Sequence, residues 1–122
     1  MRWTADPLSA AAMRLYLPGV GARVVGYGVE LYADVRPARV PADDVIVEWP
    51  LDAAERPAAE PAARVEIPFD HRSLDAAELL RWRLRVRSAM RRSLDAGALG
   101  TNAVVDRSAR RAWVLFSRPP AA

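Results

Sequence analysis

Hydrophobic and polar residues alternate strictly over residues 24–35, which is the pattern of a strand with one face in the core. Gly26 and Gly28 fall on the polar face, where they leave room for a close neighbour or permit a bulge, so we expect the strand to bend there. The side chains predicted to face the core are Val25, Tyr27, Val29, Leu31, Ala33 and Val35.

Two shorter apolar runs, at residues 45–49 and residues 64–69, predict two further strands. Residues 51–63 between them are rich in proline and alanine and predict a surface loop. Residues 1–22 are expected to be irregular or weakly helical up to the turn signal Pro18-Gly19.

A helical period replaces the alternation over residues 73–94. Ser73 is the expected N-cap, Asp75 and Glu78 lie in the first turn, and the helix should stop before Gly97. Residues 81–87 also alternate with period two, but the flanking segments consist of good helix formers and favour a helix. The core-facing stripe at 100° per residue is Ala76, Leu79, Trp82, Val86, Met90 and Leu94. Residues 102–116 fit either a final strand or a closing helix.

These elements predict an α+β fold in a single domain, residues 1–122. A small antiparallel sheet from residues 24–35, 45–49 and 65–69 should be covered by one long amphipathic helix, residues 73–94. The predicted core residues are Val25, Val29, Leu31, Val45, Val47, Trp49, Val65, Ile67, Leu79, Trp82, Val86 and Met90.

The composition fits one globular domain. With 122 residues, of which 52% are hydrophobic, the chain can bury one core, and it lacks the composition of a disordered protein. The absence of cysteine excludes disulfides and thiolate metal sites. No apolar run has the length of a signal sequence or membrane span, so we expect a cytoplasmic protein with no membrane partner.

All 18 basic residues are arginine, which is the usage of a GC-rich bacterial genome. Residues 1–68 carry seven arginines and ten acidic residues, net −3, whereas residues 69–122 carry eleven arginines and five acidic residues, net +6. This asymmetry indicates either an anion-binding face or two halves that attract each other.

The sequence predicts no catalytic, cofactor-binding or metal-binding residues. The single histidine, His71, lies in a polar turn. The adjacent acids Asp43 and Asp44 precede a predicted strand, and this pattern predicts a solvated turn. Gly26-Tyr27-Gly28 lacks the following helix that would supply amide donors to a phosphate.

Six arginines of the predicted helix form the one candidate binding site, for an anion or a nucleic acid. No nucleic-acid motif accompanies them, so nucleic acid is an unlikely partner, and pairing with Glu30, Asp34 and Glu48 of the first half is the alternative. The six residues are Arg81, Arg83, Arg85, Arg87, Arg91 and Arg92.

One stretch resembles the late, C-terminal part of the haem-dependent catalase-like proteins. It comprises residues 29–34, the run Val-Pro-Ala-Asp-Asp-Val-Ile-Val-Glu-Trp-Pro at residues 40–50, and Ala-Arg-Val-Glu-Ile-Pro at residues 63–68. Residues 99–117 are similar to the family's Leu-Gly, Asn-Arg and basic closing helix. The resemblance implies a truncated piece of that scaffold without peroxide chemistry, because the family's haem tyrosine and distal histidine motifs have no counterpart around Tyr16, Tyr27, Tyr32 or His71.

Three functions are therefore expected. The first is a non-enzymatic interaction domain with a protein partner or a homodimer formed through the edge of residues 24–35. The second is a subunit of a haem enzyme of catalase or peroxidase type, with haem bound only if another chain supplies the ligands. The third is an anion or nucleic-acid binder.

Overall fold

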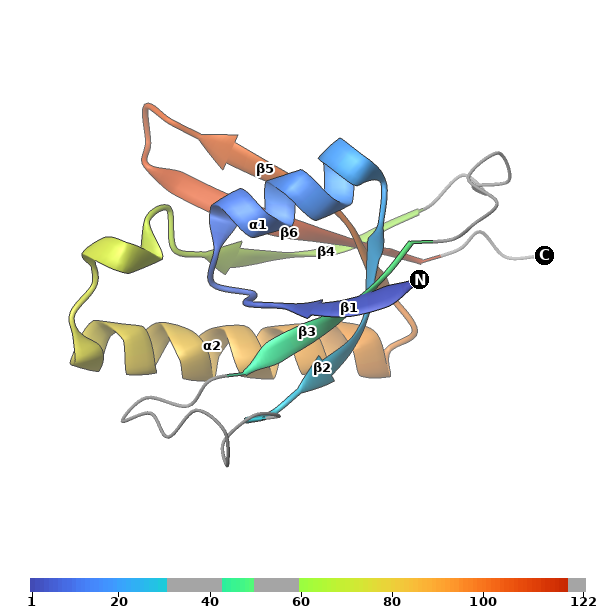
Figure 1. Cartoon of the computed structure of the whole chain (residues 1–122), viewed down its shortest axis with the longest axis horizontal. Helices are drawn as coiled ribbons and strands as arrows, with labels where there is room; N and C mark the ends of the chain where they lie inside the picture. Colours follow the sequence, from blue (N-terminus) through green and yellow to red (C-terminus); the bar gives the residue numbers. More distant parts are fainter. Residues whose placement is uncertain (31–42, 50–59, 119–122) are drawn as a thin grey trace.

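The structure, a computed structural model, describes residues 1–30, 43–49 and 60–118. Within these residues six strands form one antiparallel sheet in the order β1-β3-β2-β5-β6-β4 (Figure 1). The α+β fold is confirmed, with twice the three strands predicted for its sheet. The strands are β1 (Arg2–Ala5), β2 (Arg23–Gly28), β3 (Asp44–Glu48), β4 (Glu60–Ile67), β5 (Leu99–Asp106) and β6 (Arg111–Arg118). The helical elements are α1 (Ala10–Arg14), the π-helical turn η1 (Leu15–Val20), the 3-10 turn η3 (His71–Ser73) and α2 (Ala76–Asp95).

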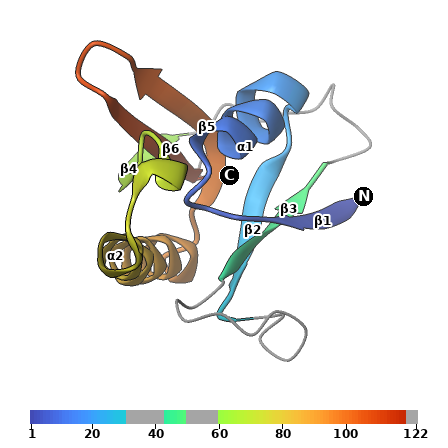
Figure 2. The same ribbon diagram turned by 60° about the vertical axis from the view of Figure 1, so that its left-hand side comes forward.

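The sheet buries one face, and both helices cover that face. Directly paired residues of an antiparallel sheet share a face, and the buried pairs run from Val47 through Val24 and Gly100 to Phe116. Figure 2 shows β1, β3 and β2 on one side and β4, β5 and β6 on the other, with α1 and α2 on opposite sides of the space between them. The core therefore lies inside a curved sheet, and the outer sheet face is open to solvent.

A β-bulge changes which side chains of β2 face the core. Val24 lies opposite Val47 and Gly26 lies opposite Ile46, so Val25 is the extra residue. Val24 is fully buried, whereas the predicted core residue Val25 is only half-buried. Past the bulge the alternation reverses, which returns Tyr27 to the core side as the sequence predicts.

Strand ends account for the other differences in the predicted sheet core. The prediction of Val45, Val47, Val65 and Ile67 as core residues is confirmed. The prediction of Trp49 as a core residue is wrong, because Trp49 follows the last residue of β3 and is 37% exposed. The prediction of Val29 as a core residue is also wrong, because β2 ends at Gly28 and the Val29 side chain is 38% exposed. The predicted core positions Leu31, Ala33 and Val35 lie outside the described residues.

The prediction of a loop over residues 51–63 is wrong for residues 60–63, because β4 begins at Glu60. Residues 51–59 lie outside the described part of the chain. A second bulge, between Pro61 and Ala63, accommodates the proline in β4 next to β6.

The first 22 residues contribute a strand and a large share of the core. β1 pairs with β3 at the sheet edge, which the prediction of an irregular segment missed. The hydroxyl of Ser9 accepts a hydrogen bond from the amide of Ala12 and caps α1. Leu8, Met13 and Leu17 are fully buried. The segment is helical as expected only from residue 10 onward.

α2 confirms the long helix with a shifted start. Asp75 is the N-cap and forms a capping box with Glu78, whereas the predicted cap Ser73 ends η3. The helix stops at Asp95, and Gly97 adopts φ +88°, as a C-terminal glycine should. In the predicted stripe Val86 and Met90 are fully buried, Leu79, Trp82 and Leu94 are half-buried, and Ala76 is exposed because it lies in the first turn, at the end of the helix.

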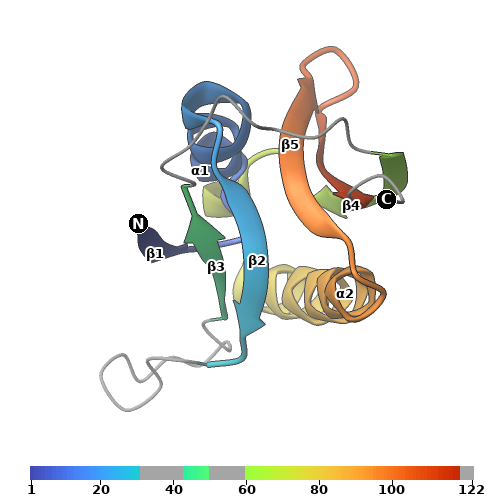
Figure 3. The same ribbon diagram turned by 90° about the vertical axis from the view of Figure 1, so that its right-hand side faces the viewer.

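Residues 102–116, which the sequence left between strand and helix, lie in the β5–β6 hairpin. The two halves of the sheet meet where β2 and β5 stand side by side, between α1 and α2 (Figure 3). Their ladder contains the pair Val24 and Gly100, and a Cβ on Gly100 would lie 2.8 Å from the Cβ of Val24. Glycine is required there because the two strands approach too closely for a side chain.

Candidate functional site

A buried carboxylate, Asp43, joins α2 to the sheet. Its side chain has no solvent-exposed surface, and it accepts hydrogen bonds from Arg87 at 2.8 Å (Nε) and 2.9 Å (Nη2). The Tyr27 hydroxyl donates to it at 2.7 Å and the Glu30 amide at 3.0 Å. The prediction that Asp43-Asp44 forms a solvated turn is therefore wrong, since both residues are buried.

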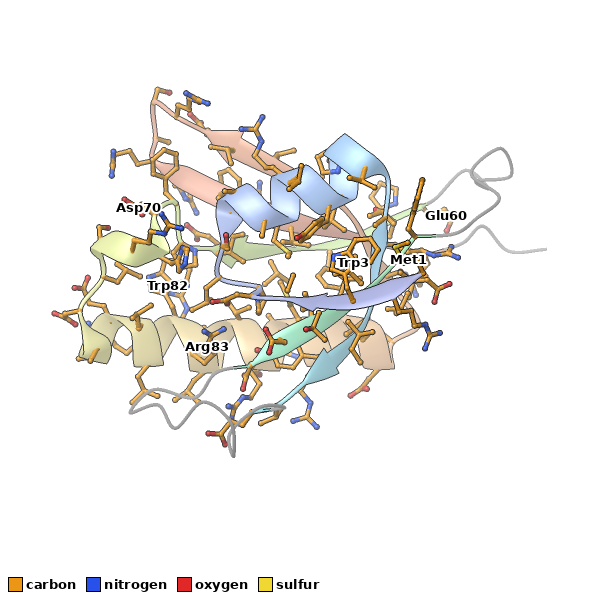
Figure 4. The ribbon with its side chains drawn as sticks, viewed as in Figure 1. Met1, Trp3, Glu60, Asp70, Trp82 and Arg83 are labelled. Carbon is orange, nitrogen blue, oxygen red and sulfur yellow. The ribbon has the colours of Figure 1, made fainter. Side chains whose placement is uncertain are left out.

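Arg83 extends this group of polar side chains toward the N-terminal segment. Its Nη1 donates to Asp6 at 2.9 Å and to the carbonyl oxygen of Asp43 at 3.5 Å. Arg83 is only 6% exposed and lies on the side of α2 that faces β3 (Figure 4). We refer to Asp6, Tyr27, Asp43, Arg83 and Arg87 as the Asp43 cluster.

The electrostatics of the Asp43 cluster favour a fixed ionic state. Burial alone would raise the pKa of Asp43, but hydrogen bonds from Arg87, Tyr27 and Glu30 outweigh it and hold that pKa below its usual range. Burial, and then the hydrogen bond to Asp43, raise the pKa of Tyr27 far above its usual value. Asp43 is thus ionised and Tyr27 protonated at neutral pH, each already engaged with a partner. The arrangement anchors α2 and offers no poised acid or base.

The structure divides the six candidate arginines into two groups. Arg83 is buried and pairs with Asp6, and Arg87 is half-buried and pairs with Asp43. The intramolecular alternative therefore holds for these two, although with partners other than the predicted Glu30 and Glu48. Glu48 instead pairs with Arg2 and Arg23, and Asp34 lies outside the described residues. The remaining four, Arg81, Arg85, Arg91 and Arg92, are exposed.

The exposed arginines lie on the solvent side of α2, which we call the α2 outer face. Within the described part of the chain none of the four makes an ion pair, and Arg85 stacks over the Trp82 ring at 4.9 Å. A shallow groove of about 470 Å³ crosses this face. Its lining is Leu84, Arg87, Ser88, Arg91, Arg92 and Asp95. Leu80 and Leu84 are 39% and 48% exposed on the same side.

The outer face of the sheet carries a second group of arginines around Trp113. Arg64 and Arg111 lie over its ring, with guanidinium carbons 5.3 and 4.9 Å from the centroid. Glu66 accepts two hydrogen bonds from Arg111, each at 3.1 Å, and these lower the pKa of its carboxyl group. Arg64 makes no ion pair with any described residue.

No group of three or more histidine or acidic side chains placed to hold a metal occurs among the described residues. Of the tyrosines, Tyr27 donates to Asp43 and Tyr16 packs edge-on against Trp3, with ring centroids 5.3 Å apart. Tyr32 lies outside the described residues, and His71 opens η3. None of the helices described is both long and apolar enough to cross a membrane.

Models of known protein families, curated proteins and solved structures yield no match to this chain. Residues 31–34, 40–42 and 50 of the stretch that resembles catalase-like proteins lie outside the described residues. Of its described parts, residues 44–48 form β3 and residues 63–67 belong to β4. Residues 99–117, which the resemblance likens to a closing helix, form β5 and most of β6.

Sequence reasoning missed Asp6 and Asp43 as partners of the helix arginines and Tyr27 as a partner of Asp43, because the three residues come from separate segments. It also missed the arginine–tryptophan group on the sheet. A signal for that group was present: Arg111, Trp113, Leu115 and Ser117 occupy alternate positions, which in a strand places them on one face.

Proposed function

We propose that this chain is a non-enzymatic interaction domain that binds an acidic, amphipathic segment of a partner protein on the α2 outer face. The observation that carries the proposal is the division of the α2 arginines. Asp6 and Asp43 pair with the inner two, whereas the outer four face solvent and form no ion pair with a described residue. Four solvent-facing guanidinium groups on one helix favour an anionic partner.

The leucines of this face favour a protein over a nucleic acid. Leu80 and Leu84 lie one turn apart and are both more than a third exposed, among the outer arginines. A phosphate backbone offers little for an aliphatic side chain to contact, whereas an amphipathic helix presents apolar and acidic side chains together. Arginine is also the charged residue that protein interfaces favour.

A homodimer formed through the edge of residues 24–35 receives no support from the sheet. The described part of that segment, β2, lies between β3 and β5 in the sheet order. β3 follows β2 along most of its length and occupies the hydrogen-bonding edge that a second copy would need. The proposal therefore commits to a different protein as the partner.

The test compares three labelled probes by fluorescence anisotropy in about 100 mM salt, where surface charges are only partly screened. The first probe is a helical peptide of about 18 residues with leucines on one side and glutamates on the other. The second replaces its leucines by serine at equal charge, and the third is single- and double-stranded DNA. We expect the leucine peptide to bind most tightly, with a Kd of about 10–100 μM.

Matched variants connect the binding to the α2 outer face. Leu84→Ser should weaken binding of the leucine peptide about tenfold, an effect of about 1.4 kcal/mol. The double variant Arg91→Glu/Arg92→Glu should weaken it by a similar factor. Arg110→Glu, an exposed arginine in the β5–β6 turn, is the control and should change binding much less. Tighter binding of DNA, or no effect of Leu84→Ser, would contradict a protein partner. A dimer in light scattering that Arg91→Glu/Arg92→Glu dissociates would identify the partner as a second copy instead.

A further inference from the structure

The outer face of the sheet contains a hollow produced by two bulges. One bulge lies between Pro61 and Ala63 in β4, and the other between Gly100 and Asn102 in β5. Both lie beside Phe116 of β6, the strand between β4 and β5, which pairs with Ala63 on one side and Gly100 on the other. Bulges bend a strand and redirect its side chains, so two at one level open a concavity in an otherwise even surface.

The hollow has the size of a small-molecule site. Its volume is about 450 Å³, within the range of roughly 300–1,000 Å³ in which proteins hold small ligands. We call it the bulge hollow. It is lined by Pro61, Ala62, Ala63, Arg64, Thr101, Asn102, Leu115, Phe116 and Ser117.

The lining combines an apolar surface with one cation and no acidic side chain. Arg64 supplies the cation, and its guanidinium is held over the Trp113 ring. The nearest carboxylate on β4, Glu66, is engaged by Arg111 through two hydrogen bonds. Arg64 itself forms no ion pair with a described residue, although its charge helps to lower the pKa of Glu66, so its guanidinium N–H groups can still pair with a ligand.

Polar groups beside Arg64 add donors. The Thr101 hydroxyl lies 3.0 Å from that of Ser117, so one of the two hydroxyl protons remains for a third group. The side-chain oxygen of Asn102 accepts from the Ala103 amide at 2.8 Å, which leaves its NH₂ group as a donor. Donors and a cation next to apolar carbon match a carboxylate with an apolar body.

We propose that the bulge hollow binds a small amphipathic carboxylate, with Arg64 pairing with the carboxylate and Leu115 contacting the apolar part. A guanidinium pairs with carboxylate and phosphate alike, but the apolar lining favours an anion with an apolar body over inorganic phosphate, which has none. This site is separate from the α2 outer face and does not depend on the function proposed above. Because the hollow is open to solvent, we expect a Kd of about 0.1–1 mM.

The experiment is an amide NMR titration of the full chain with 3-phenylpropanoate, its neutral amide 3-phenylpropanamide, and inorganic phosphate. We expect saturable shifts at Arg64, Thr101, Asn102 and Leu115 with the carboxylate, and binding at least about tenfold weaker with the amide and with phosphate. Arg64→Gln should weaken the binding of 3-phenylpropanoate about tenfold, and the rest of its NMR spectrum should remain that of the folded chain.

Arg110→Gln is the matched control, because Arg110 also stacks on an aromatic ring, that of Phe69 at 4.8 Å, and does not line the hollow. It should leave the carboxylate affinity unchanged. Equal affinity for amide and carboxylate, equal affinity for phosphate, or shifts that fail to saturate would each overturn the proposal. So would an Arg64→Gln variant that binds as tightly as the unchanged chain.

Discussion

Removing the Arg87 guanidinium should destabilise the fold far more than removing the exposed guanidinium of Arg91, one turn farther along the same helix. In Arg87→Met, Asp43 keeps the Tyr27 hydroxyl and the Glu30 amide but loses two charge-assisted hydrogen bonds and its counter-charge. An unpaired buried charge costs about 3–5 kcal/mol, and the two remaining donors place this case near 3 kcal/mol. That is a large part of a total stability of roughly 5–15 kcal/mol.

The assay is urea unfolding at pH 7 followed by circular dichroism, with Arg91→Met as the matched control. Arg91 is exposed on the same helix and should change stability by less than about 0.5 kcal/mol. The double variant Asp43→Asn/Arg87→Met should lose less than the sum of the single losses, by about 1–2 kcal/mol, because a neutral amide no longer needs a counter-charge. Equal losses for Arg87→Met and Arg91→Met, or strictly additive losses, would refute the anchoring role of the Asp43 cluster.

Three further predictions concern the contact between β2 and β5, the burial of Trp82 and the pH dependence of the Asp43 cluster. Gly100→Ala should cost about 1–3 kcal/mol in urea unfolding through overlap with Val24, and Gly26→Ala should cost less because it meets the end of a flexible side chain. Trp82→Ala should lower the free energy of unfolding by about 2 kcal/mol. This is less than the loss for a fully buried tryptophan, because the Trp82 ring is half-buried. A loss above about 4 kcal/mol would contradict that burial. Because the folded state lowers the pKa of Asp43 below 3.8, it binds fewer protons than the unfolded state, so this stabilisation is complete above about pH 5 and is lost as pH falls. Asp43→Asn should flatten the dependence of the urea midpoint on pH between about 2 and 5, and an unchanged slope would count against the reasoning.

Local pattern was sufficient for the elements whose own residues decide them. The 3.6-residue stripe containing Val86 and Met90 predicted α2, and the apolar runs around Val45 and Val65 predicted β3 and β4. These predictions hold because the period of a side-chain pattern follows directly from helix or strand geometry. The α+β class follows from the same signals.

Pairing between distant segments decided everything else. The bulge in β2 arises from its register against β3, and it places Val24 rather than Val25 in the core. Alternation alone cannot reveal an inserted residue, because the pattern on each side of a bulge is still period two. The strand β1 has only four residues and exists through its pairing with β3.

The same limit applies to the arginines. By helical period Arg83, Arg87 and Arg91 share one side of the helix, so their spacing does not show that the first two are paired and the third is not. Only the fold brings Asp6 and Asp43, 77 and 44 residues away, against the first two and leaves the third in solvent. The sequence determines how many ionic groups the chain has and where they lie along it. Which of them are neutralised depends on distance in space, which only the tertiary structure sets.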